Sequence, residues 1–243
     1  MMQEDIQQNK SPEAIPWNIG DVGKATLLTI AVTVIIVGLL AVLLALVVLS
    51  GSDWVRESWF ILIIAGIPLY GAMALSVWLF SVRKYKCGWR ALGFRNSNVK
   101  GLLLGISVVL IGIAFGSLYD FIIVQTGAES PSSLPADFVG TWYNWAMLGL
   151  FAIVVAPVAE ELFFRGFMLP GIGKRFGKGW GIVISAIIFA LAHLQPGALG
   201  ALVPIFLLGL LLAWLYIKTK SIWPCIFAHF TYNSIAFVFM IIS

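Results

Sequence analysis

Two adjacent carboxylates, Glu160 and Glu161, and a nearby arginine, Arg165, lie in a stretch that otherwise reads as a membrane-spanning helix. An ionisable residue inside such a helix costs roughly 2.5 to 3.5 kcal/mol on insertion scales. Three of them so close together therefore require a structural or chemical reason. Glu161 and Arg165 are four residues apart, which predicts an ion pair on one helix face. Glu160 is rotated by about 100° from Glu161 and is left to face other groups.

The chain has only two histidines, and both lie in apolar runs where solvation is poor. His193 follows Phe189 by four residues, and His229 precedes Asn233 by four. Residues at this spacing share a helix face, so His229 and Asn233 can reach the same ligand. Because polar groups in a bilayer must find one another, we expect Glu160 and the two imidazoles to converge on a water.

One carboxylate and two imidazoles are groups that peptide hydrolysis uses. One group deprotonates a water, and hydrogen-bond donors hold the developing oxyanion. The same three residues, Glu160, His193 and His229, could instead bind a divalent metal such as zinc, with an open position for water. The HExxH spacing of many zinc proteases is absent, so the residues alone do not choose between these alternatives.

Composition indicates an all-α, polytopic transmembrane bundle. Hydrophobic residues make up 60% of the 243 residues and charged residues only 11%. A helix needs about 20 apolar residues to cross the bilayer core. The apolar runs predict about seven spans in one transmembrane domain, residues 25–243, preceded by a polar tail, residues 1–24, which does not resemble a cleaved signal. The expected spans are 26–50, 59–82, 101–124, 142–166, 180–195, 199–217 and 221–242.

The distribution of basic residues predicts the orientation of the bundle. All but one, Arg56, of the 15 Lys and Arg residues fall at the inner side if the N-terminus is cytoplasmic. Short cytoplasmic loops carry such an excess, so we expect the N-terminus inside and the C-terminus outside. The net charge of +4 then describes a surface facing anionic lipid and gives no sign of nucleic-acid binding.

Depth in the membrane sets a condition on the site. A helix rises 1.5 Å per residue, and Glu160 lies near the inner end of its span if that span stops at Gly166. Convergence with the histidines therefore predicts that the span runs further, or that the link 171–181 dips inward. Pro157 should loosen the helix by removing the bond to the carbonyl of Ile153. The glycines of the third span, such as Gly105 and Gly112, predict close helix packing.

Three motifs resemble those of the CPBP family of intramembrane proteases, which includes the CAAX-processing enzymes of the Rce1 type. They are EExxxR at Glu160 to Arg165, FxxxH at Phe189 to His193, and HxxxN at His229 to Asn233. They occur in the family's order on successive late spans. The similarity covers about residues 140–235.

The resemblance implies a role for each motif residue and a site that opens towards the cytoplasm. It implies that Glu160 and His193 activate water and that His229 and Asn233 stabilise the oxyanion. It further implies that Glu161 and Arg165 orient the site. Members of the family have been described both as metal-dependent and as glutamate-type proteases, and we favour no obligate metal. A chain of this length resembles the prokaryotic members, so we expect a multi-pass protein of the plasma membrane.

The leading hypothesis is an intramembrane endopeptidase that cleaves a membrane-associated peptide or protein near the cytoplasmic interface. A second hypothesis is a non-catalytic membrane protein, such as a bacteriocin-immunity or regulatory factor, that keeps the site as a structural polar cluster. A proton-coupled transporter is disfavoured because no repeat of the spans is visible.

Overall fold

Helices account for almost all of the chain that the computed structural model describes, which is residues 15–49, 58–127, 142–194 and 199–242, and these contain no strand. The helices are α1 (Ile19–Leu49), α2 (Ser58–Val77), α3 (Val99–Gln125), α4 (Trp142–Gly149), α5 (Ala156–Glu160), α6 (Leu169–Phe176), α7 (Lys178–Leu191), α8 (Leu202–Thr219) and α9 (Trp223–Ile242). Arg56, most of the link between the third and fourth expected spans and the first 14 residues of the polar tail lie outside the described residues.

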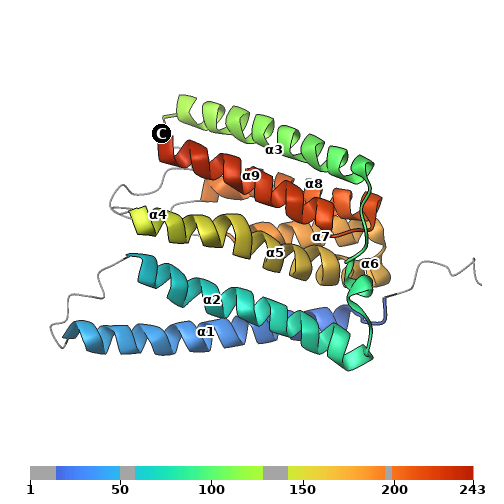
Figure 1. Cartoon of the computed structure of the whole chain (residues 1–243), viewed down its shortest axis with the longest axis horizontal. Helices are drawn as coiled ribbons and strands as arrows, with labels where there is room; N and C mark the ends of the chain where they lie inside the picture. The colour runs from blue at the N-terminus through green and yellow to red at the C-terminus, as the bar shows by residue number, and fades with distance from the viewer. Residues whose placement is uncertain (1–14, 50–57, 128–141, 195–198, 243) are drawn as a thin grey trace, which may run out of the picture.

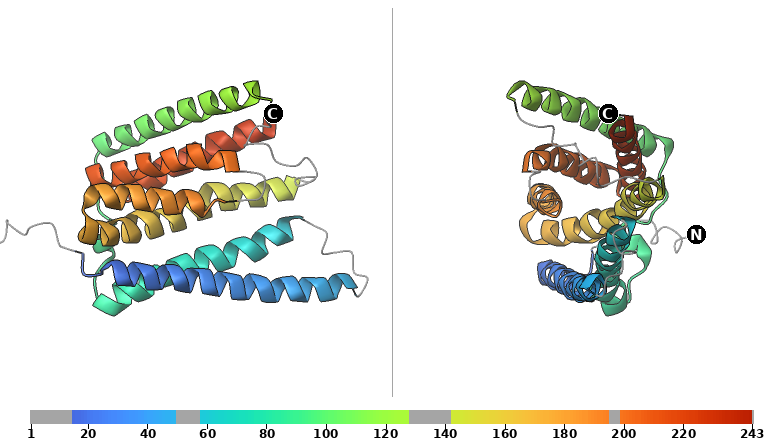
Figure 2. Two further views of the ribbon diagram at one scale, coloured as in Figure 1. Left: turned by 180° about the vertical axis from the view of Figure 1, so that it is seen from behind. Right: turned by 90° about the vertical axis from the view of Figure 1, so that its left-hand side faces the viewer.

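The long helices lie side by side and alternate in direction, as expected for a chain that repeatedly crosses a bilayer (Figures 1 and 2). Within the described residues, six helical segments are long and apolar enough to span a membrane, and Lys178–Leu191 is a shorter apolar helix. The predicted multi-pass helical membrane bundle is therefore confirmed. The orientation of its termini stays a prediction.

One continuous helical segment, Trp142–Phe176, carries the two glutamates. It consists of α4, α5 and α6 joined by two π-helical stretches, Leu150–Val155 and Glu161–Met168. A proline follows each stretch within two residues, Pro157 after the first and Pro170 after the second. Proline lacks an N–H and disturbs the regular helical bonding, as a π-helical turn also does. The helix runs ten residues past Gly166, to Phe176. The prediction that this span continues beyond Gly166 is therefore confirmed.

Glycines allow the sharp reversal from α6 to α7. Gly177, between the two helices, has a φ of +90°, a conformation that residues with a side chain rarely adopt. A Cβ at Gly181 would lie 2.9 Å from the carbonyl oxygen of Leu169, so α7 packs against α6 only because this position is glycine. The glycine-rich link thus serves the turn and the packing of the helix that leads to His193.

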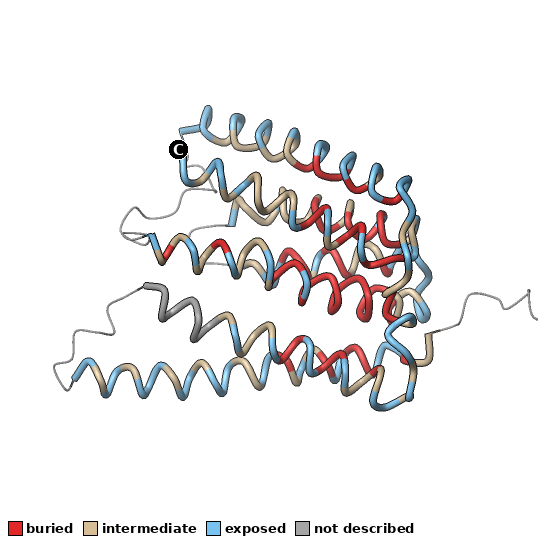
Figure 3. Tube along the Cα trace, in the orientation of Figure 1, coloured by how far each residue is buried: buried red, intermediate tan, exposed pale blue. Residues whose placement is uncertain are grey.

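Buried residues concentrate in the half of the bundle where α1 begins (Figure 3). The predicted close packing of the third span is confirmed there, because α3 lies against α8 and α9. A Cβ at Gly105 would lie 3.3 Å from the carbonyl oxygen of Pro224, and one at Gly112 would lie 3.0 Å from the ring of Tyr232. The rest of the bundle exposes the apolar side chains that a lipid-facing surface requires.

Polar contacts fasten the first helix at this same end. α1 begins at Ile19, inside the stretch expected to be a polar tail. Trp17, just before it, is fully buried, and its indole Nε1 donates to the carbonyl of Phe167 at 2.9 Å. The carboxylate of Asp21 accepts from Lys84 and from the hydroxyl of Tyr85. The start of α1 is therefore tied both to the residues that follow the π-helical stretch Trp78–Arg83 after α2 and to the helical segment that carries the glutamates.

A basic connection between α2 and α3 also rests on that segment. The fully buried Leu92 places its carbonyl oxygen 2.7 Å from where a Cβ of Gly166 would lie. The next residue, Gly93, has a φ of +92°, and its carbonyl accepts from the N–H of Ile222 at 2.8 Å. This connection therefore holds the glutamate segment against the start of α9.

Candidate active site

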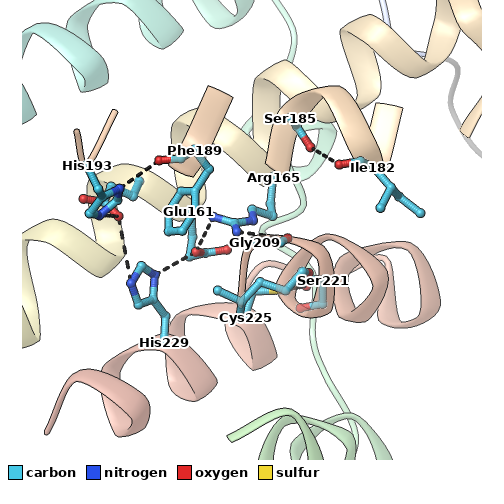
Figure 4. Close-up of polar contacts among 12 residues, drawn as sticks. Glu161, Arg165, Ile182, Ser185, Phe189, His193, Gly209, Ser221, Cys225 and His229 are labelled. Carbon is cyan, nitrogen blue, oxygen red and sulfur yellow. Dashed lines mark hydrogen bonds and ion pairs between the residues drawn. The ribbon is translucent and has the colours of Figure 1, made fainter. Parts of the chain in front are cut away.

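The predicted pair between Glu161 and Arg165 is present and completely buried. Arg165 Nη1 lies 2.8 Å from Glu161 Oε1, and the two side chains are 1% and 0% exposed. Arg165 also donates to the carbonyl of Gly209 on α8 at 3.3 Å, and its guanidinium lies 4.3 Å from the ring centre of Phe189 on α7 (Figure 4). A buried charge needs such partners to offset its loss of hydration.

His229 on α9 contacts the same carboxylate from the other side (Figure 4). Its Nδ1 lies 2.8 Å from Glu161 Oε1. A carboxylate oxygen accepts hydrogen bonds, so Nδ1 carries the proton in this contact. The other ring nitrogen, Nε2, lies 3.9 Å from Glu160 Oε2. Glu161 therefore orients the imidazole so that its second nitrogen is directed at Glu160.

His193 reaches Glu160 from the end of α7. Its Nδ1 lies 2.8 Å from the carbonyl oxygen of Phe189. A carbonyl can only accept, so Nδ1 again carries the proton and Nε2 is the free nitrogen of the neutral ring. That Nε2 lies 3.8 Å from Glu160 Oε2. The His193 side chain is 32% exposed, against 3% for His229, so the site is open on the His193 side.

Glu160 has a buried carboxylate oxygen, Oε2, that lacks a hydrogen-bond partner among the described residues. A buried polar atom without a partner is costly and calls for a ligand or a water. The two Nε2 atoms at 3.8 and 3.9 Å are too far for direct hydrogen bonds. A water about 2.8 Å from each group fits between Glu160 and either imidazole. The predicted convergence of one carboxylate and two imidazoles is thus present.

The same three residues do not form a zinc site as they stand. Ligands about 2.1 Å from a tetrahedral zinc ion lie about 3.4 Å from one another. The two Glu160 to histidine separations, 3.8 and 3.9 Å, are wider. In the described part of the chain, no three His, Cys, Asp or Glu side chains are grouped as metal ligands.

The π-helical stretch before Pro157 adds to the expected effect of this proline. In the π-helical stretch before it, the N–H of Ala156 donates to the carbonyl of Phe151, five residues back. The next carbonyl in this register, that of Ala152, faces Pro157, which has no N–H. Because Ala156 donates to Phe151 and Pro157 has no N–H, the carbonyl of Ala152 is left without a helical donor.

Asn233 supplies the missing donor. Its Nδ2 lies 2.7 Å from the carbonyl oxygen of Ala152. Asn233 is one helical turn beyond His229, as the sequence predicted, but its amide is bonded to this backbone carbonyl. It thereby connects α9 to the helical segment that carries Glu160.

An apolar groove of about 530 Å³ lies between α2 and the glutamate segment, next to the site. It is lined by Ile67, Tyr70, Gly71, Ala74, Phe151, Val154, Val155, Val158, Ala159 and Leu162. Tyr70 is the polar side chain in this lining, and Ala159 of the lining precedes Glu160 in the chain. An extended apolar chain could therefore lie in this groove with its polar part near Glu160.

Several contributors to the site had no signal in the sequence. Gly209 contributes only its carbonyl, and the glycine lets α8 approach α7, since a Cβ there would lie 3.2 Å from Ala186 and Phe189. Tyr70 and Ala152 are ordinary residues of apolar helices. Every residue has a backbone carbonyl, and a close helix approach depends on the fold. The spacing of residue types could therefore not reveal these contributors.

Comparisons with known proteins point to the same segment. Residues 142–235 match the family model described as "Type II CAAX prenyl endopeptidase Rce1-like". A Bacillus subtilis (strain 168) protein, "Putative membrane peptidase YdiL", is 32% identical over 81 residues, which cover 33% of this chain and 32% of that protein. The match thus spans about a third of the relative's length. No solved structure matches the chain significantly. The resemblance to the CPBP family that the three motifs indicated is therefore confirmed, through the Rce1-like segment at residues 142–235.

Proposed function

We propose that this protein is an intramembrane endopeptidase that hydrolyses a peptide bond of a membrane-associated peptide or protein. The observation that carries the proposal is the position of Glu160 Oε2, which is buried, lacks a hydrogen-bond partner among the described residues and lies 3.8 and 3.9 Å from the Nε2 atoms of two histidines. A structural polar cluster would be expected to pair these groups directly. Their separation instead leaves room for one water.

Water activation uses Glu160 and His193. Glu160 accepts a proton from the water as its oxygen forms a bond to the carbonyl carbon of the scissile peptide. The neutral His193 holds the water with its free Nε2, because its Nδ1–H is bonded to the carbonyl of Phe189. Glu160 then returns the proton to the amine nitrogen as the C–N bond breaks. Atoms and charge balance, since one water enters and an acid and an amine leave.

His229 is the candidate for stabilising the oxyanion. Its Nδ1–H is bonded to the carboxylate of Glu161, which directs Nε2 towards Glu160. A protonated ring presents Nε2–H towards Glu160 and can donate to the negative oxygen that forms during attack. Arg165 supports this role indirectly, because it holds Glu161 in place from the opposite side.

The groove beside Glu160 favours a substrate with an apolar segment. The family model that matches residues 142–235 is named for prenylated CAAX substrates. A prenylated peptide is therefore a rational probe, alongside a peptide whose apolar part is a single membrane helix. Both carry a long apolar group next to a polar peptide, which suits a groove open to lipid next to a polar centre.

The test uses the full chain purified in detergent and returned to liposomes. Three internally quenched peptides are offered, a farnesylated CaaX peptide, its unprenylated form and a peptide with one apolar helix. We expect cleavage of at least one and its loss in Glu160→Ala at an unchanged melting temperature. Undiminished cleavage by Glu160→Ala would overturn the proposal. A cellular phenotype that survives Glu160→Ala would favour the non-catalytic immunity or regulatory alternative.

A further inference from the structure

The contact between Asn233 and Ala152 supplies a hydrogen-bond donor that the helix itself does not provide. Pro157 leaves the Ala152 carbonyl without a helical donor, since the preceding N–H, that of Ala156, is committed to Phe151. An unpaired carbonyl away from water is costly. Asn233 meets this requirement across 81 residues of chain with a 2.7 Å hydrogen bond.

The contact joins the two helices that place the reacting groups. Ala152 belongs to the same continuous helical segment as Glu160, which is the last residue of α5. Asn233 belongs to α9, one turn beyond His229. A bond between them fixes the register of α9 along the glutamate segment, and this register sets the 3.9 Å between Glu160 Oε2 and His229 Nε2.

We infer that Asn233 is a positioning residue, needed because Pro157 deprives Ala152 of its helical donor. The inference rests on the proposed function, and it changes what Asn233 does in it. The family resemblance implies that this asparagine stabilises the oxyanion. Here one of its two amide protons is bonded to the backbone, so its removal disturbs the spacing of Glu160 and His229 before it removes any donor to the substrate.

The two roles predict different results when Pro157 is also changed. Pro157→Ala restores an N–H at this position. The Ala152 carbonyl then has a helical donor in either register, from residue 157 in a π turn or from residue 156 in an α turn. Asn233 is thereby relieved of its positioning role. An oxyanion donor would be needed equally with and without the proline.

The experiment is a double-mutant cycle of Asn233→Ala and Pro157→Ala, with kcat and KM measured for the peptide that the wild-type protein cleaves. We expect Asn233→Ala to lower kcat about tenfold when Pro157 is present, because the part-buried carbonyl of Ala152 then lacks a donor. When Asn233→Ala is added to Pro157→Ala, it should lower kcat less than about threefold, which the cycle reports as coupling. An equal loss with and without the proline would overturn the inference.

Pro170→Ala provides the matched control, because Pro170 lies in the same segment and also follows a π-helical stretch. Combined with Asn233→Ala, it should leave the loss unchanged. If Pro170→Ala rescues Asn233→Ala as well as Pro157→Ala does, the rescue reflects general helix stabilisation, and the inference fails.

Melting temperatures test the contact independently of catalysis. We expect Asn233→Ala to melt about 3 to 6 °C lower when Pro157 is present, with most of this difference absent when Pro157→Ala is the parent protein. This result is expected even if no peptide is cleaved, so failure of the proposed function is distinguishable from failure of the inference. If Asn233→Ala does not fold, recovery of folded protein by Pro157→Ala supports the inference and lack of recovery contradicts it.

Discussion

His229 Nδ1 and Arg165 Nη1 both lie 2.8 Å from the same oxygen, Oε1 of Glu161. Glu161 is thus held between a guanidinium and an imidazole. The Oε2 atoms of both glutamates lack a hydrogen-bond partner in the described chain, but that of Glu160 lies 3.8 and 3.9 Å from the Nε2 atoms of His193 and His229. Two identical side chains, one residue apart, therefore have different environments. Glu161 is bound by two side chains through Oε1, whereas Glu160 has an oxygen between two imidazoles that is available to a ligand.

This difference predicts opposite effects of two amide substitutions. Glu160→Gln should abolish cleavage, by at least about a hundredfold, because an amide cannot accept the proton of the water. Its effect on stability should be small, since Oε2 has no hydrogen bond to lose among the described residues. Glu161→Gln should lower the free energy of unfolding by roughly 3 to 5 kcal/mol, because it leaves Arg165 as a buried charge without its ion-pair partner.

Thermal unfolding in detergent and cleavage rates per folded molecule measure both effects. If the two substitutions destabilise the protein equally, Glu160 is bonded in the native state and the division between the two carboxylates is wrong.

His193 should contribute to rate more than to stability. Its side chain is 32% exposed and, among the described residues, has one hydrogen bond, to the carbonyl of Phe189. His193→Ala should therefore lower kcat about 10² to 10⁴-fold, the range of general acid–base contributions, with little change in melting temperature. His229→Ala, by contrast, should lower both, because that ring is buried and bonded to Glu161. Loss of stability in His193→Ala that matches His229→Ala would contradict this assignment.

Much of the site followed from spacing alone. The i, i+4 relation of Glu161 and Arg165 predicted their ion pair, and the scarcity of polar groups in apolar spans predicted that Glu160 would meet His193 and His229. These inferences succeed because a bilayer offers few alternative partners. A buried polar group in such an environment pairs with whatever other polar groups the neighbouring helices carry.

Helix register could not be read in the same way. The π-helical stretch before Pro157 leaves the Ala152 carbonyl without a helical donor, and no residue type in the sequence indicates a π turn. The partner of Asn233 was therefore not predictable. Nor was the role of Gly177 and Gly181, because a positive φ and a close helix approach depend on where α7 lies.

Chelation provides a test of the chemistry at Glu160. The separations from Glu160 to the two histidines are wider than those of tetrahedral zinc ligands, and a water fits them. We therefore expect cleavage by the purified protein to persist after dialysis against EDTA and 1,10-phenanthroline. Loss of cleavage on chelation, with recovery on addition of zinc, would show that the three side chains close around a metal.

Gly166 should be intolerant of any side chain. A Cβ there would lie 2.7 Å from the carbonyl oxygen of Leu92, a backbone atom that cannot move aside alone. Gly166→Ala should thus lower the free energy of unfolding by about 1 to 3 kcal/mol, the range for overpacking. Gly179→Ala is the matched control, because a Cβ at Gly179 meets no atom within 4 Å. Equal melting temperatures for the two variants would show that the connection at Leu92 does not rest on the glutamate segment.

The groove beside Glu160 can be narrowed without disturbing the fold. A Cβ at Gly71 meets no atom within 4 Å, and Gly71 lines the groove, so Gly71→Leu should place an apolar side chain in it. If the groove binds the apolar part of the substrate, KM should rise while kcat is largely kept, because the reacting groups are untouched. Gly38→Leu on α1 makes the same change at an exposed position with equally open surroundings. It should leave KM unchanged. An unaltered KM in Gly71→Leu would mean that the substrate does not reach Glu160 through this groove. The exposed side of the site at His193 would then be the alternative route.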